Sequence, residues 1–193
     1  MKFTQAIYCE TVNRVPSLFE IDFNRILPDS PRQLKIEIIT PQLACFLNSV
    51  WHSLLPRLHF SNIFRSGQYI CFGAHYRGQW YAVGIWSSPV ARFRIFDKNQ
   101  ILELRRLAIS PAAPKYTASF MISQMIKIIK RGFPNVKRLV SYQDTEAHTG
   151  TIYKASNWQI GCKIKGGSWS RKKRKRNPAQ TLADKIRWEF YLR

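Results

Sequence analysis

The sequence predicts an α/β fold in which helices flank one mixed, mostly antiparallel sheet. Three observations support this class. Two apolar runs separated by a short polar break indicate a β-hairpin, segments of strand and helix periodicity alternate after it, and 45% of the 193 residues are hydrophobic. A chain of this size can bury a real core. An early hairpin followed by alternating strands and helices favours a single sheet whose strands run in both directions.

The chain is expected to form one main domain. Residues 1–33 contain three prolines and give mixed signals, so we interpret them as an irregular N-terminal lead-in. The domain is expected over residues 34–193, including a basic loop at 166–180.

The first half of this domain predicts a strand, a helix and a hairpin. LKIEIIT at 34–40 alternates apolar and polar side chains, as a half-buried strand does. After Pro41, the segment 42–55 repeats apolar residues at helical spacing. Two apolar runs within 68–86 flank the polar Tyr76–Gln79, which is typical of a hairpin.

The second half predicts alternating strands and helices. ILELRRLAIS at 101–110 reads as a strand, and residues 116–131 read as a strong helix that Gly132 and Pro134 end. The remaining expected elements are a strand at 136–142, a short helix at 151–156, and strands at 158–165 and 185–192.

Charge is the unusual feature of the composition. The chain has 31 Lys and Arg against 11 Asp and Glu, a net charge of +20. This imbalance indicates a polyanionic partner, nucleic acid before an anionic membrane. The N-terminus lacks the apolar core of a signal peptide, and no apolar run approaches the roughly 18 residues of a membrane span. We therefore expect a soluble, intracellular protein.

The four cysteines are widely spaced and form no CxxC pair. A zinc finger is therefore not expected, and free thiols in a reducing cytosol are the simpler interpretation.

Six consecutive basic residues are the clearest partner signal. Adjacent like charges repel one another until they meet phosphates, so this run favours nucleic-acid contact over a solvated loop or an import signal. Trp169 and Trp188 would add base stacking, or belong to the core. The residues predicted to contact DNA are Arg171, Lys172, Lys173, Arg174, Lys175 and Arg176.

The stretch SYQDTEAHTGTIYKASNW, residues 141–158, concentrates reactive side chains after a predicted strand. Asp144, His148 and Tyr153 lie near the carboxyl end of that strand, where open α/β sheets bind ligands. The alternative is that this stretch is only a well-capped helix start.

Two arginines lie within the predicted strand 101–110. Alternation sends Arg105 and Arg106 to opposite faces, and an unpaired buried guanidinium is costly. One of them is therefore expected to meet a carboxylate or a phosphate, an internal salt bridge to Glu103 or Asp144 being the structural alternative.

Two further sets of candidates are weaker. Ser119 and Ser123 are spaced i, i+4 on the long helix and face the sheet, or are silent helix residues. His52 would meet Asp144 and Tyr153 if the first helix packs above the strand ends, and imidazole, carboxylate and phenolate suit iron better than zinc. A hydrogen-bonded structural histidine is the alternative.

Three segments carry a resemblance to a known family. LELRRLAIS, APKYTASFMIS and LVSYQDTEAHTGTIYKASNW resemble the Mom family of bacteriophage DNA-modification proteins, within the acyltransferase (GNAT)-like fold. The match covers roughly residues 34–193. It implies a catalytic domain that converts adenine in double-stranded DNA to its N6-carbamoylmethyl (acetamido) form, which protects phage DNA from restriction in the cytoplasm of the bacterial host.

The resemblance also implies roles for particular residues. By position, the catalytic candidates are Arg106, Ser119, Ser123, Asp144 and Tyr153, and an iron site would use His52, Asp144 and Tyr153. The chain lacks the Q/RxxGxG/A pyrophosphate loop of acetyl-CoA enzymes, so acetyl-CoA is not the expected donor. A CoA-dependent acyltransferase acting on a protein or small amine, and a non-catalytic basic nucleic-acid-binding protein, remain alternatives. The oligomeric state stays open, a homodimer included.

Overall fold

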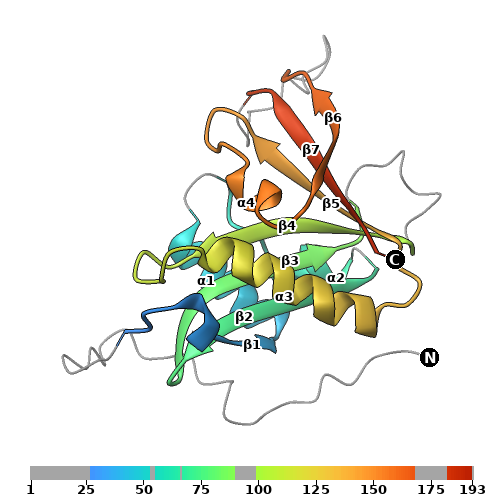
Figure 1. Ribbon diagram of the computed structural model, residues 1–193. Helices are drawn as coiled ribbons and strands as arrows, with labels where there is room; N and C mark the ends of the chain where they lie inside the picture. The colour runs from blue at the N-terminus through green and yellow to red at the C-terminus, as the bar shows by residue number, and fades with distance from the viewer. Residues whose placement is uncertain (1–26, 53–54, 66, 90–98, 168–181, 193) are drawn as a thin grey trace.

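The computed structural model describes residues 27–52, 55–65, 67–89, 99–167 and 182–192. Its strands form one seven-stranded sheet in the order β1-β2-β3-β4-β5-β7-β6 (Figure 1). The elements are η1 (Pro31–Gln33), β1 (Lys35–Ile38), α1 (Pro41–Trp51), α2 (Phe60–Phe64), β2 (Tyr69–Tyr76), β3 (Gln79–Ser87), β4 (Ile101–Ile109), α3 (Thr117–Gly132), β5 (Arg138–Asp144), α4 (Thr151–Lys154), β6 (Gln159–Ile164) and β7 (Lys185–Tyr191).

The predicted fold class is confirmed. β4 and β5 pair in parallel, and the other strand pairs are antiparallel. Every expected strand and helix is present, whereas η1 and α2 were not expected. The first helix is shorter than predicted, because it ends at Trp51 and His52 is its C-cap.

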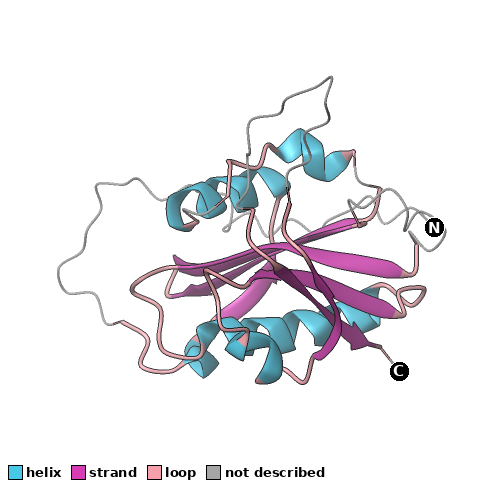
Figure 2. Cartoon of the chain, turned by 90° about the horizontal axis from the view of Figure 1, so that it is seen from above, coloured by secondary structure: helices cyan, strands magenta, loops and turns pink. Residues whose placement is uncertain are grey.

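Helices cover both faces of the sheet, as Figure 2 shows. α1 and α2 pack on one face, here called the α1 face, where Ile63 joins a core cluster with Val83 and Ile85 of β3. α3 and α4 pack on the opposite α3 face, where Met121 and Met125 join a larger cluster with buried side chains of β2 to β5 and β7. Among the described helices, none is long and apolar enough to cross a membrane.

β4 and β5 separate at their carboxyl ends. Their pairing runs from Ile101 opposite Arg138 to Leu104 opposite Ser141. Beyond that point β4 stays paired with β3 and β5 stays paired with β7. Figure 1 shows β5, β7 and β6 rising away from the layer of β1 to β4. The sheet is therefore split at the edge where β4 and β5 both end.

The prediction that Arg105 and Arg106 lie on opposite faces is wrong. Ile85 of β3 pairs with Arg106, but the next residue, Trp86, pairs with Leu104, so Arg105 is the extra residue of a β-bulge. A bulge interrupts the alternation of side chains. Arg106 pairs with a residue of the α1-face core, and Arg105 reaches the Asn62 carbonyl of α2 at 3.5 Å. Both arginines therefore lie on the α1 face.

Candidate functional site

The candidate site lies where β4 and β5 separate. Both strands run in the same direction there, and the carboxyl ends of such strands are the usual ligand-binding edge of an α/β sheet. Arg106 comes from the bulged part of β4, and Asp144 is the last residue of β5. The bulge in β4 and the split leave this edge without regular pairing between β4 and β5, so Arg106 and Asp144 lie outside the paired part of the two strands.

Arg106 presents a half-buried guanidinium with unused hydrogen-bonding capacity. Its Nη1 donates to the Arg105 carbonyl at 2.8 Å, and its Nε is buried without a hydrogen-bond partner. Burial lowers the pKa of Arg106, and the charge of Arg105 lowers it further. An unpaired buried donor is costly, so this group is suited to binding a carbonyl, carboxylate or phosphate oxygen of a ligand.

His52, at the end of α1, is close enough to Arg106 to feel the charge of its guanidinium group. Its backbone N–H donates to the Asn48 carbonyl at 2.9 Å, and its ring Nδ1 is buried without a partner. Burial lowers the pKa of His52, and the charges of Arg106 and His148 lower it further. The imidazole is therefore neutral at pH 7 and can accept a proton.

His148, which the sequence placed near this strand end together with Asp144 and Tyr153, lies on the turn that follows β5. The electrostatic influence of His148 on His52 places the two histidines in the same neighbourhood as Arg106. The sequence feature that pointed to His148 was its position four residues after Asp144. That His52 would lie in the same neighbourhood as His148 was not apparent from the sequence.

Asp144 shapes this turn. Its Oδ1 accepts from the N–H groups of Glu146 at 3.0 Å and Ala147 at 3.3 Å, and its carbonyl accepts from the His148 N–H at 3.1 Å. Strand alternation places Asp144 on the face opposite Ser141. Asp144 therefore positions the turn that carries His148.

The same turn is tied to the connection between β6 and β7. The Asp184 carbonyl accepts from the Thr145 N–H at 3.1 Å and from its hydroxyl at 2.8 Å. The Asp184 carboxylate accepts from the Gly166 N–H at 2.7 Å. A Cβ at position 166 would collide with the Leu182 carbonyl, so only glycine fits this close approach. The predicted DNA-contacting residues Arg171–Arg176 belong to this connection but lie outside the described residues.

Tyr153 lies on the α3 face, at the last β4–β5 pair. Its hydroxyl hydrogen-bonds Ser141 Oγ at 2.9 Å, and Ser141 donates to the Leu104 carbonyl at 3.3 Å. The ring stacks on Trp188 with centroids 5.3 Å apart and meets Trp158 edge-on. Burial raises the pKa of Tyr153, so its phenol is protonated. Trp188 is a core residue here and not a base-stacking one, since 2% of it is exposed.

The predicted iron ligands do not come together as a set. Tyr153 is on the α3 face and bonded to Ser141, whereas Asp144 holds its turn and His52 lies by Arg106. A phenol of raised pKa is a poor source of phenolate. Within the described ranges, no group of three or more His, Cys, Asp and Glu residues is arranged to hold a metal. These residues therefore do not fit an iron centre.

Ser119 and Ser123 are engaged within their own helix. Ser119 Oγ donates to the Tyr116 carbonyl at 3.1 Å, and Ser123 Oγ donates to the Ser119 carbonyl at 3.0 Å. They line an open cavity of about 410 Å³ on the α3 face, away from Arg106. The cavity is completed by Ser30, Pro31, Arg32, Tyr116, Phe120 and Ala155.

Prolines and local hydrogen bonds occupy part of the connection from β4 to α3. Pro111 and Pro114 have no N–H, the N–H groups of Ala112 and Ala113 bond to Ser110, and that of Thr117 bonds to Pro114. A pyrophosphate held at a helix start needs several free N–H groups.

Comparison with solved structures defines the class of fold. The chain is similar to a GNAT-family acetyltransferase from Streptococcus pneumoniae, with a TM-score of 0.58 and 14% identity over 83% of this chain and 99% of that one. For an N-acetyltransferase from Staphylococcus aureus, the TM-score is 0.59 and the identity is 12%, over 82% of this chain and 97% of that one. For a GNAT-family acetyltransferase from Elizabethkingia anophelis, solved with acetyl-CoA bound, the TM-score is 0.58 and the identity is 14%, over 83% of this chain and 99% of that one. The fold is therefore GNAT-like.

The family follows from the sequence itself. Residues 36–189 match the Mom protein family, and the chain belongs to this family. No curated protein sequence matches the chain.

Proposed function

We propose that this protein is a transferase that modifies the N6 amino group of adenine in double-stranded DNA, giving the N6-carbamoylmethyl form that protects phage DNA from restriction. Membership of the Mom family over residues 36–189 carries this proposal. The GNAT-like fold, whose structural neighbours include N-acetyltransferases, supports transfer to an amine. The net charge of +20 supports a nucleic-acid partner. In this proposal the enzyme acts in the cytoplasm of the bacterial host.

The chemistry requires the target base to reach the split between β4 and β5. An adenine inside a duplex cannot do so, and the enzyme therefore extrudes it from the stack. The buried donors of Arg106 then orient an oxygen of the donor substrate, and neutral His52 accepts the proton that the adenine amine loses when it attacks the donor carbon. Tyr153 lies at the same split on the α3 face and is protonated at neutral pH. In this proposal its hydroxyl leaves Ser141 and supplies a hydrogen bond or a proton to the leaving group, which departs on that side of the split. Asp144 acts by holding the turn that carries His148.

Neither acetyl-CoA nor iron is part of this proposal. The connection after β4 contains two prolines and lacks the glycine-rich pyrophosphate loop of acetyl-CoA enzymes, and the three candidate iron ligands do not meet at one place. The basic run Arg171–Arg176 is proposed to contact DNA phosphates, because it has six adjacent positive charges. In the sequence it precedes Asp184, whose carbonyl is bonded to Thr145 beside Asp144.

Mass spectrometry of nucleosides tests the proposal. DNA from bacteria that express the protein is digested and compared with DNA from cells carrying the empty vector. Deoxyadenosine heavier by one carbamoylmethyl group in the first sample alone is the expected result. Unmodified adenine from cells with abundant folded protein would refute it.

A second candidate is a CoA-dependent acyltransferase acting on a protein or small amine. The structural neighbour solved with acetyl-CoA bound favours it. Calorimetry separates the two functions, because this candidate requires tight binding of acetyl-CoA and leaves DNA bases unchanged. A non-catalytic DNA-binding protein would give salt-sensitive DNA binding without either result.

A further inference from the structure

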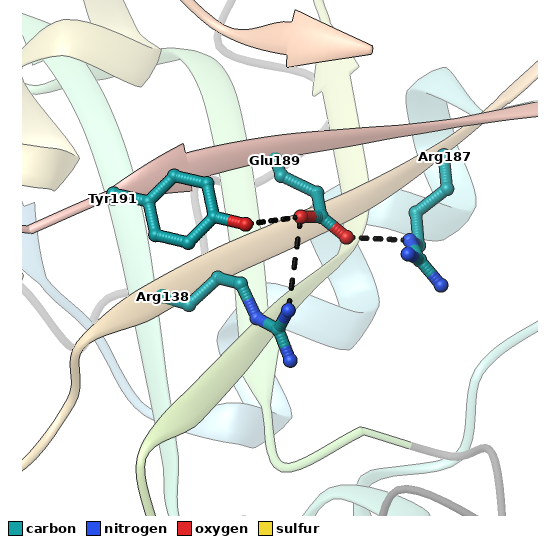
Figure 3. A network of polar contacts seen from close by, with 4 residues as sticks. All are labelled: Arg138, Arg187, Glu189 and Tyr191. Atoms are coloured by element: carbon teal, nitrogen blue, oxygen red, sulfur yellow. Dashed lines mark hydrogen bonds and ion pairs between the residues drawn. The ribbon is translucent and has the colours of Figure 1, made fainter. Parts of the chain in front are cut away.

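Two arginines share one buried carboxylate on the C-terminal strands. Glu189 Oε1 forms an ion pair with Arg187 Nε at 2.6 Å, and Glu189 Oε2 lies 3.7 Å from Arg138 Nη1. The Tyr191 hydroxyl donates to Oε2 at 2.8 Å. Figure 3 shows the three partners arranged around the carboxylate. The cluster therefore holds two positive charges against one negative charge.

The exposed part of this cluster is its cationic part. The Glu189 side chain is 6% exposed, whereas those of Arg138 and Arg187 are 30% and 22% exposed. Glu189 contacts Arg187 through Nε, which leaves the two terminal nitrogens of that guanidinium outside the ion pair (Figure 3). An anion that approaches this surface meets guanidinium groups whose counterion lies beneath them.

Gly161 makes room for this arrangement on β6. A Cβ built at that position would collide with the carboxyl group of Glu189. The absence of a side chain lets the carboxylate lie against β6, beneath the two arginines. Glu189 is thus a buried counterion that holds both guanidinium groups at this surface by charge.

The register connects the cluster to the candidate site. Arg187 of β7 pairs with Tyr142 of β5, and the pair two residues further along is Lys185 with Asp144. Alternation places Arg187, Lys185 and Asp144 on one face of the sheet. Two residues along a strand span roughly 7 Å, about twice the rise of roughly 3.4 Å per nucleotide along one DNA strand. Arg187 is therefore about two nucleotides along one strand from a base held near Asp144, and Arg138, six residues from Asp144 on β5, lies further along the same face.

We propose that Arg187 and Arg138, supported by Glu189, bind the phosphodiester backbone of DNA beside the nucleotide whose adenine enters the site. The proposal rests on the proposed function, because DNA is its partner. Fork-shaped guanidinium groups match phosphate oxygens better than lysine does. A phosphate also completes the charge balance of a cluster that holds one cation in excess.

Salt-dependent binding of a fluorescent duplex to the full-length protein tests this assignment. In Arg187→Gln and Arg138→Gln, the slope of log affinity against log salt is expected to fall by about 0.9 for each phosphate that the variant no longer neutralises, equally for DNA of different sequence. The matched control is Arg131→Gln, which removes the same charge from an exposed position at the end of α3. Circular dichroism and thermal melting identify the variants that fold.

Glu189→Gln is the second variant, and it distinguishes the proposal from a purely structural ion pair. It raises the net charge by one and leaves both arginines in place, so general attraction to DNA would strengthen. Loss of the oriented guanidinium groups is expected to weaken binding instead. Equal or tighter binding by Glu189→Gln, or arginine variants that match Arg131→Gln, would overturn the inference. If the unchanged protein shows no salt-dependent binding, the proposed function fails with it.

Discussion

Replacing Tyr153 with phenylalanine separates stability from chemistry, because the structure shows what the hydroxyl contributes to each. The ring keeps its stacking on Trp188, and Ser141 keeps its hydrogen bond to the Leu104 carbonyl. The substitution therefore removes one buried hydrogen bond without leaving a polar atom unpaired, at a cost of about 1 kcal/mol. For a chain of this size, this corresponds to a fall in Tm of about 2–4 °C.

The expected loss of activity is much larger. A proton donor in the transition state contributes about 100-fold or more, equivalent to roughly 2.7 kcal/mol. A protein with ordinary stability of about 5–15 kcal/mol stays folded after losing 1 kcal/mol. Adenine modification, measured by nucleoside mass spectrometry at several times after induction, should therefore fall at least about 100-fold while the melting curve moves only slightly.

Ser141→Ala is the matched control for Tyr153→Phe. It breaks the same hydrogen bond from the other side and leaves the phenol in place, without a partner, at a cost of about 1–3 kcal/mol. Because the bond to Ser141 lowers the pKa of Tyr153, its removal keeps the phenol protonated. If activity follows stability, Ser141→Ala will be the less active variant. If the phenol takes part in the reaction, Tyr153→Phe will be the less active variant. Adenine modification by Tyr153→Phe within tenfold of the unchanged protein would refute that role.

Substitutions at three other places test the geometry. The pKa of His52 is lowered in the folded state from about 6.5, so the unfolded chain takes up the proton first and stability falls as pH decreases below about 6.5. His52→Gln should reduce this loss of stability in melting curves between pH 7 and pH 5. Above pH 7 the substitution should leave stability unchanged. Gly166→Ala forces a collision with the Leu182 carbonyl and should lower the free energy of unfolding by about 1–3 kcal/mol, whereas Gly167→Ala, with nothing within 4 Å of the new Cβ, should change it by less than about 0.5 kcal/mol. Ser119→Ala and Ser123→Ala remove hydroxyl groups that donate to carbonyls of their own helix and should leave adenine modification near its original level, while a loss of modification in well-folded variants would assign them a catalytic role.

Local periodicity was sufficient to predict the elements of this fold. The alternation in LKIEIIT, the helical spacing of residues 116–131 and the polar break at Tyr76–Gln79 each describe a property of neighbouring residues, and each element is present. Periodicity carries no information on which strands pair when they are far apart in the chain. β7 lies between β5 and β6. Contacts between distant segments stabilise this position, because Trp188 stacks on Tyr153 and its indole N–H donates to Gln143 at 2.7 Å.

The candidate site was predictable in its residue types but not in its arrangement. Asp144 and Tyr153 were named from their positions near a strand end, and Arg106 as an arginine within a predicted strand and by the family resemblance. All three lie around the split between β4 and β5. One inserted residue in β4 moved Arg105 and Arg106 to the same face, against simple alternation. A bulge depends on how two strands align, and neither strand reveals it alone. The sequence placed His148 near the end of this strand, but it did not show that His148 lies in the same neighbourhood as His52 and Arg106, which come from distant segments.

The insertion of β7 also explains why a buried carboxylate lies in the outer part of the sheet. β5 ends at the candidate site, and β7 begins beside that end, so every second residue of β7 from Lys185 onward faces the same side as Asp144. Two arginines at this edge would repel one another if no anion lay between them. Glu189 lowers that repulsion, and Gly161 gives its carboxylate a place against β6. The DNA strand that we propose as partner has regularly spaced phosphates, and one of them would balance the second guanidinium group, because the carboxylate balances only the first.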